Sequence, residues 1–225
     1  MPARSARDRK PRGRPPEVSE AKIHAAALEI VSKSGADAVT IGRLCEALNV
    51  SPKTIYNHVS GREAILDGVV SLVFERLSLD IPPRAGWRRQ ARAWVHGVRQ
   101  YILEAPNVAP LLGSRSGASL AWLAEIGRLG AILERAGFDD RNYALATTVL
   151  MRLATTLAVG EHFSFMSEQA KAIHAAIETN APAQADQLRR LAASLPEEDR
   201  IFELIVESSL DAIGALAPKS TRQRR

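Results

Sequence analysis

Two short helix signals separated by a tight turn, at residues 40–58, constrain the fold of this chain more than any other feature. Thr40 suits the N-cap of the first helix, and the apolar residues after it have the spacing of one helix face. Asn49 follows, and its short side chain tolerates a left-handed backbone conformation. Pro52 suits the first position of the second helix, which we expect to run to about His58. The sequence therefore predicts a helix, a tight turn and a second helix.

Longer helices are predicted on both sides of this pair. The apolar stripe before it is expected to end at Gly35. Ser51 suits the N-cap of the second short helix, and Ser60 with Glu63 reads as a capping box that begins a longer helix. That longer helix is expected to stop before Pro82. Two short helices held between longer ones are the physical pattern of a helix-turn-helix.

The remainder of the chain is predicted to be helical as well. Aromatic residues make up only 5% of the sequence, and no run of alternating β-branched and polar residues suggests a sheet. A short segment is expected after Pro110, and longer helices are expected at about 87–104, 118–136, 141–162, 168–179, 184–193 and 197–216. The predicted fold class is all-α, with an N-terminal three-helix helix-turn-helix domain and a larger C-terminal helical domain for ligand binding and dimerisation.

Charge divides the chain into four predicted regions. The formal net charge is +5, and six basic residues against one acidic residue lie within 1–16. Four further basic residues lie within 219–225, so the rest of the chain is mildly acidic. Segments with this composition are typical of disordered tails that bind a polyanion. We predict a disordered basic arm, a helix-turn-helix domain, a regulatory and dimerisation domain, and a disordered basic tail, at 1–16, 17–80, 84–217 and 218–225.

Other features limit the classes of protein to which the chain can belong. The single cysteine, Cys45, can form neither an internal disulfide nor a multi-cysteine zinc site, which favours a reducing compartment such as the cytoplasm. No apolar segment typical of a secretory signal follows the basic N-terminus. Residues 142–160 are apolar but carry a central Arg152 and several threonines, so we predict a buried helix and no membrane span. We also predict no cofactor and no bound metal.

The outward face of the second short helix is polar enough to enter the major groove of DNA. This face offers Lys53, Thr54, Asn57 and His58, with Tyr56 at its flank. These side chains supply donors and a methyl group for base edges and phosphate oxygens. The alternative is an ordinary helical pair whose polar residues face water.

The segment from Thr40 to Val59, followed by Gly61 to Leu66, resembles the N-terminal signature of TetR-type regulators. Three positions depart from that pattern: Asn49 replaces the turn glycine, Cys45 a small alanine, and Arg62 the lysine that begins the fourth helix. Each replacement keeps the physical role of the usual residue. The resemblance implies that the DNA-contacting residues are Thr40, Lys53, Thr54, Tyr56, Asn57, His58 and Arg62.

The basic arm contains a second candidate DNA contact. Arg12 and Arg14, separated by glycine and followed by two prolines, resemble a sequence that inserts arginine into a narrow minor groove. The alternative is a solvated tail that adds only salt-dependent, nonspecific affinity.

The resemblance also implies partners for the C-terminal domain. TetR-type regulators are homodimers that bind palindromic operators, and we expect helices 141–162 and 197–216 to pair across the two-fold axis. The alternative is that their apolar residues form the core of one chain. A small-molecule effector would bind among the C-terminal helices and separate the reading helices, with repression as the usual mode. Candidate pocket residues are His96, Arg99, Trp122, Arg152 and His162, and Arg115 is a further polar group that could project into such a cavity.

Two other classes of function are alternatives to DNA binding. A small helical enzyme would need a nucleophile with a base, or a set of metal ligands. The five histidines have no metal-binding spacing, Cys45 lies on an inward stripe, and no glycine-rich phosphate loop occurs. A helical protein-interaction adaptor is the other alternative, and it would have no salt-dependent affinity for duplex DNA.

Overall fold

The computed structural model describes residues 18–115, 119–162, 171–172, 175 and 185–218. Every regular element within these ranges is a helix, which confirms the predicted all-α class. The predicted arm at 1–16 and nearly all of the tail at 218–225 lie outside the described residues. The predicted helix at 168–179 also falls there, apart from three residues.

The first helix, α1, spans Glu20–Ser34. Ser19 caps it by accepting a hydrogen bond from the Lys22 backbone N–H at 3.4 Å. Gly35 ends it with a φ of 77°, a conformation that glycine adopts without steric cost. A single 3₁₀ turn, Ala36–Ala38, then leads to the helix pair.

The fourth helix, α4, spans Arg62–Glu75, and the prediction about how it begins is wrong. Its N-cap is Gly61, at a φ of 142° and with no side-chain cap, so the Ser60–Glu63 capping box does not form. The helix stops before Pro82, as predicted, and ends at Glu75. The chain continues extended from there because Leu77 and Leu79 are buried in the core, and a continued helix would have a different pattern of buried side chains.

The C-terminal helices follow the predicted ranges to within about two residues. They are α5 (Trp87–Leu103), α6 (Ala109–Arg115), α7 (Leu120–Arg135), α8 (Asp140–His162), α10 (Ala185–Ala193) and α11 (Glu198–Leu216). Gly137, at a φ of 85°, follows α7, and its N–H donates to the Glu134 carbonyl while the Phe138 N–H donates to that of Leu133. These two bonds form a Schellman motif, as the predicted C′ glycine requires.

The C-terminal domain is organised around α8, which contacts α5, α6, α7 and α11. Residues 140–160 are long and apolar enough to cross a membrane, but about a third of that stretch is buried among these helices. A helix at the centre of a packed bundle has the same composition. On α5 and α7, the rings of Trp94 and Trp122 pack at a tilt with centroids 5.7 Å apart, and the Trp94 indole N–H donates to the Glu125 carbonyl at 3.1 Å.

Ion pairs join α5 to α11 along their shared side. Arg92 bonds to Glu203 at 2.5 Å and to Glu207 at 2.7 Å. Arg88 and Arg99 pair with Asp211 and Asp199, one on each side of this contact. The acidic face of α11 is therefore neutralised by the basic face of α5.

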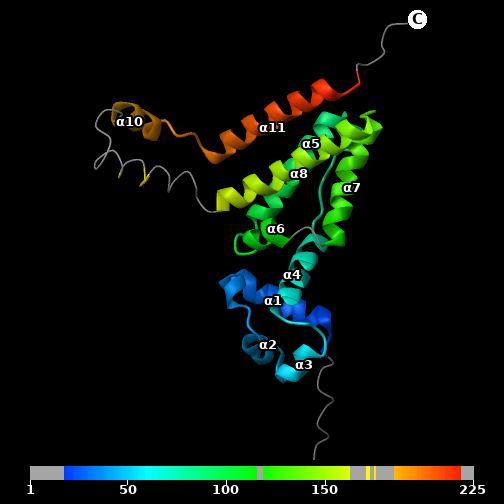
Figure 1. The fold of residues 1–225 in the computed structure, drawn as a ribbon, viewed down its shortest axis with the longest axis vertical. Helices are drawn as coiled ribbons and strands as arrows, with labels where there is room; N and C mark the ends of the chain where they lie inside the picture. The colour runs from blue at the N-terminus through cyan, green and yellow to red at the C-terminus, as the bar shows by residue number, and fades with distance from the viewer. Residues whose placement is uncertain (1–17, 116–118, 163–170, 173–174, 176–184, 219–225) are drawn as a thin grey trace, which may run out of the picture.

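The elements form an elongated molecule with the two short helices at one end (Figure 1). α2 and α3 lie at the end farthest from α11, and α4 runs from them toward the C-terminal helices (Figure 1). α4 contacts α1 in the N-terminal part and both α6 and α7 in the C-terminal part. The predicted domain boundary after residue 80 therefore follows a helix that belongs to both sets of contacts.

Candidate nucleic-acid interface

The first helix of the predicted pair, α2, spans Ile41–Leu48 and has the predicted caps. The Thr40 hydroxyl accepts a hydrogen bond from the Arg43 backbone N–H at 3.2 Å. Asn49 has φ 53° and ψ 51°, the left-handed conformation that the turn requires. Leu44 is fully buried, so α2 is held by its inner face.

The second helix, α3, spans Pro52–Tyr56 and is two residues shorter than predicted. Ser51 caps it, accepting from the Thr54 backbone N–H at 3.3 Å, and the two hydroxyls of Ser51 and Thr54 lie 3.0 Å apart. Asn57 is the C-cap, and His58 follows in a turn. The helix ends early because Val59 must turn inward, where it is 95% buried, toward the start of α4.

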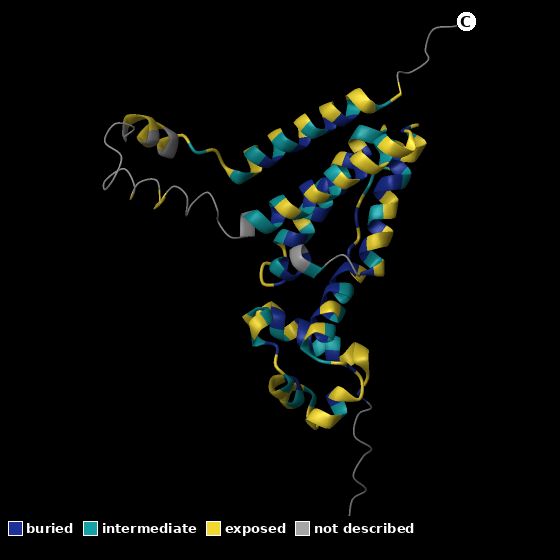
Figure 2. Ribbon diagram, viewed as in Figure 1, coloured by how far each residue is buried: buried dark blue, intermediate teal, exposed yellow. Residues whose placement is uncertain are grey.

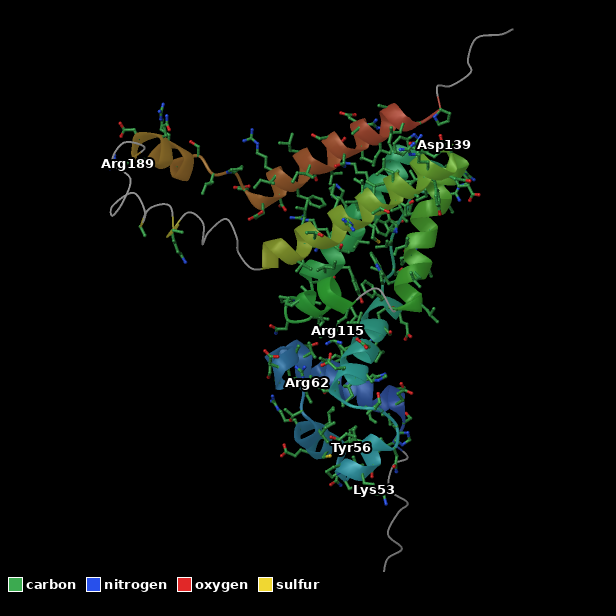
Figure 3. All side chains as sticks on the ribbon, in the orientation of Figure 1. Lys53, Tyr56, Arg62, Arg115, Asp139 and Arg189 are labelled. Atoms are coloured by element: carbon green, nitrogen blue, oxygen red, sulfur yellow. The ribbon has the colours of Figure 1, made fainter. Side chains whose placement is uncertain are left out.

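One face of α3 anchors it while the other is open to solvent. Ile55 is completely buried, whereas the Tyr56 side chain is 57% exposed despite its size. Lys53, Asn57 and His58 are also exposed, and Figure 2 shows this face at the tip of the molecule. Lys53 and Tyr56 lie at that same tip (Figure 3). Within the described part of the chain, the side chains of Lys53, Tyr56 and His58 form no hydrogen bond or ion pair.

The two predicted threonines have structural tasks in the free protein. Thr40 caps α2, and Thr54 is half-buried against Ser51. Arg12 and Arg14 lie outside the described residues. The structure therefore brings Lys53, Thr54, Tyr56, Asn57 and His58 together at one surface, and their contacts with DNA stay a prediction.

Arg62 makes contacts that the sequence did not indicate. Its Nη2 donates to the Ala36 carbonyl at 2.9 Å and its Nε to the Val39 carbonyl at 3.2 Å. Nη2 also lies 3.3 Å from Asp37 Oδ1. The guanidinium thus holds the turn before α2 against the start of α4, and its predicted role as a phosphate ligand stays untested.

Arg115 was also predicted differently, as one of several polar groups near an effector pocket. In the structure it lies at the end of α6 and pairs with Glu63 and, at 2.9 Å, with Asp67, both on α4 (Figure 3). The hydrogen bond between Arg115 and Glu63 lowers the pKa of the Glu63 carboxyl and raises the pKa of the Arg115 guanidinium. Sequence reasoning missed both arginine contacts because they join residues 23 to 52 positions apart.

The predicted effector-pocket residues are not gathered in one cavity. His96 and Arg99 lie near each other on α5, where both contact the Phe202 ring of α11. Trp122 is buried between Phe74 and Trp94, and Arg152 is exposed on α8. His162 is the last residue of α8. Of the other four, none lines the cavity of about 440 Å³ that opens between α1, α4 and α5.

Comparison with known proteins agrees with this geometry. The sequence model of a family described as bacterial regulatory proteins, tetR family, matches residues 23–69, which include all of α2 and α3. Over these residues the chain is similar to tetR-family regulatory proteins. The matched segment begins within α1 and ends within α4, so it covers the helix pair and the helices that hold it.

Individual relatives are similar over a longer stretch of the chain. An HTH-type transcriptional regulator of Saccharopolyspora erythraea is 28% identical over 123 residues, which cover 55% of this chain and 52% of the relative. The uncharacterised HTH-type regulator YdeS of Bacillus subtilis is 32% identical over 120 residues, or 52% of this chain and 54% of YdeS. The chain thus matches about half the length of these curated relatives.

Solved structures match over a greater length. Crystal structures of ActR from Streptomyces coelicolor, one without ligand and one in complex with actinorhodin, both give a TM-score of 0.76. They are 23% and 22% identical in sequence and cover 90% and 92% of this chain and 100% of ActR. At this identity the likeness concerns the fold, and it extends the TetR-type architecture to the C-terminal helices.

Proposed function

We propose that the protein is a sequence-specific DNA-binding regulator of transcription, with α3 as the helix that enters the major groove. The observation that carries this proposal is the contrast between the two faces of α3, one of which is buried while the other is exposed. Ile55 anchors the helix, while Lys53 and Tyr56 project from the tip of the molecule without a partner in the described chain. Exposed polar side chains on a slim, rigidly held helix suit base edges and phosphates.

We propose further that the regulator acts as a homodimer on a palindromic operator. Two large apolar side chains are left exposed on the helices expected to pair: Leu145 on α8 is 50% exposed and Leu204 on α11 is 69% exposed. Both suit a two-fold contact between copies. Leu153, Val206 and Ile213 lie on the same two helices, but they are buried within the single chain.

The proposed mode of action is repression that a small molecule relieves, in the cytoplasm. The fold supports it, because ActR, which the chain resembles in fold, was crystallised with actinorhodin bound. His96 and Arg99 on α5 remain the best candidates for polar effector contacts, since both sit against an aromatic ring inside the C-terminal domain. A ligand that prefers one dimer geometry over another would change operator affinity.

The proposal is tested by selecting bound sequences from a library of random duplexes with the full chain. The expected product is a palindrome of two half-sites, and a variant with Lys53→Ala and Tyr56→Ala is expected to select none. The same selection with cell-extract metabolites added tests for an effector. Recovery of only unrelated, asymmetric sequences by the parent chain would contradict the proposal and favour the adaptor alternative.

A further inference from the structure

A continuous series of ionic contacts runs from α6 in the C-terminal domain to the turn in front of α2. Arg115, at the end of α6, pairs with Glu63 and Asp67, which lie four residues apart on one face of α4. Glu63 uses its other carboxylate oxygen for Arg62, with Oε1 3.5 Å from Nη1. Arg62 then donates to the carbonyls of the 36–39 turn.

The geometry gives each member of this series a distinct position. Arg115 is only 24% exposed and bridges two carboxylates with different nitrogens, which fixes its guanidinium plane against α4. Glu63 is shared, one oxygen to each arginine. Displacement of α6 therefore changes the contacts of the same carboxylate that orients Arg62.

We propose that Arg115, Glu63 and Arg62 form an ionic relay in which Arg62 positions the α2–α3 pair according to the position of α6. The relay rests on the proposed function for its biological meaning, since it deepens how the C-terminal domain would regulate DNA binding. Arg62 is then a positioning residue and not a phosphate ligand. The turn that it holds contains Ala36 and Val39, directly before the Thr40 cap of α2.

A second arginine in the same chain offers a matched control. Arg92 on α5 also bridges two carboxylates four residues apart on a neighbouring helix, Glu203 and Glu207. Replacing Arg92 removes two ion pairs, as replacing Arg115 does. Arg92 lies between α5 and α11, however, and has no contact with the relay. If the loss of such an arginine acted only by lowering the overall stability, either replacement would have the same effect on the exchange of the 36–44 amides.

The test is hydrogen–deuterium exchange of the full chain, without DNA, for the parent, Arg115→Ala and Arg92→Ala. In Arg115→Ala we expect the backbone amides of residues 36–44 to exchange about two- to fivefold faster, the range that loss of partly exposed ion pairs allows. In Arg92→Ala these amides should match the parent. Unchanged exchange at 36–44 in Arg115→Ala overturns the relay, because the relay requires the loss of Arg115 to reach that segment through Glu63 and Arg62.

Further variants keep the test decisive. If Arg115→Ala accelerates exchange throughout the chain, Glu63→Gln decides, since it removes the shared charge at constant size. It is expected to accelerate 36–44 selectively, and an unselective or absent effect overturns the relay. Arg115→Lys keeps the charge but cannot hold both carboxylates in the same geometry, so its exchange at 36–44 should lie between parent and Arg115→Ala.

The relay and the proposed function fail separately. Duplex affinity is measured on the same variants in a parallel binding titration. A selective response at 36–44 in a chain that binds no duplex would leave the relay standing and refute DNA binding. Duplex binding by a chain with no response at 36–44 would refute the relay and leave DNA binding standing.

Discussion

The α2–α3 pair and the α5–α11 pair are both rich in polar side chains, but the two pairs differ in whether these side chains have partners within the chain. On α5, Arg88, Arg92 and Arg99 each meet a carboxylate of α11. On α3, the side chains of Lys53 and Tyr56 form no hydrogen bond or ion pair within the described part of the chain. Polar groups that are matched within the chain hold helices together, whereas unmatched groups on a rigid support are available to another molecule.

The two regions also use aromatic residues differently, and this gives the largest expected effect. Trp94 is completely buried, stacks near Trp122 and donates its indole N–H to Glu125. Trp94→Ala should lower the free energy of unfolding by about 3–5 kcal/mol because it leaves a large cavity in the core. Urea unfolding measures this change. A loss below about 1 kcal/mol would show that the C-terminal core is not organised around this side chain.

Tyr56 should behave in the opposite way. Its side chain is more than half exposed, so Tyr56→Ala should leave the free energy of unfolding within about 0.5 kcal/mol of the parent. Affinity for the selected duplex should fall by about 10- to 100-fold. Leu123, which is exposed on α7 at 48%, provides the control, and Leu123→Ala should leave duplex affinity unchanged. Equal effects of the two substitutions would remove the distinction between the regions.

The sequence predicts most of the helix pair because its signals are local. Thr40, Asn49 and Ser51 act on backbone groups within three or four residues, so their roles can be read from spacing alone. The same reasoning failed at Ser60, where the geometry of the turn, with Gly61 at positive φ, decides where α4 begins.

Long-range contacts could not be predicted from spacing. Arg62 and Arg115 were assigned to DNA and to an effector pocket because a lone arginine gives no sign of its partner. The structure pairs them with groups that fold close to them from distant positions. Arg152, which seemed suited to a pocket by its apolar neighbours, lies on the exposed side of α8 because the helix turns that face outward.

The turn between α2 and α3 gives a prediction of intermediate size. Asn49 is the one residue other than glycine with a positive φ among those described. Asn49→Ala should lower the free energy of unfolding by about 1 kcal/mol, since a β-carbon without a polar group is strained there. Asn49→Gly should be tolerated with little loss. Comparing the two by thermal unfolding distinguishes backbone strain from loss of the amide, which both substitutions remove.

The smallest effect concerns two histidines, His24 on α1 and His96 on α5. Burial lowers the pKa of His24, although the Glu20 and Glu75 carboxylates oppose it, and burial likewise lowers the pKa of His96. Both side chains are therefore favoured neutral in the folded protein, and the unfolded chain takes up protons first as the pH falls. Their contribution to stability is complete above the unfolded pKa of about 6.5 and declines below it.

Urea unfolding at a series of pH values between about 8 and 5 measures this decline. His24→Gln removes the titrating group on α1, and His96→Gln removes the one on α5. Each substitution should make the free energy of unfolding decline less over this pH range. Profiles parallel to the parent for both variants would contradict the assigned burial effect.

The claim that α3 contacts the duplex is tested most directly by photocrosslinking. Tyr56 is replaced by p-benzoylphenylalanine in the full chain, and the exposed Leu123 on α7 is replaced in the same way as a control. Irradiation with the selected duplex should give a covalent protein–DNA adduct from position 56 and none from position 123. A duplex that binds but gives no adduct at position 56, or gives it only at position 123, would contradict the assignment of α3 as the reading helix.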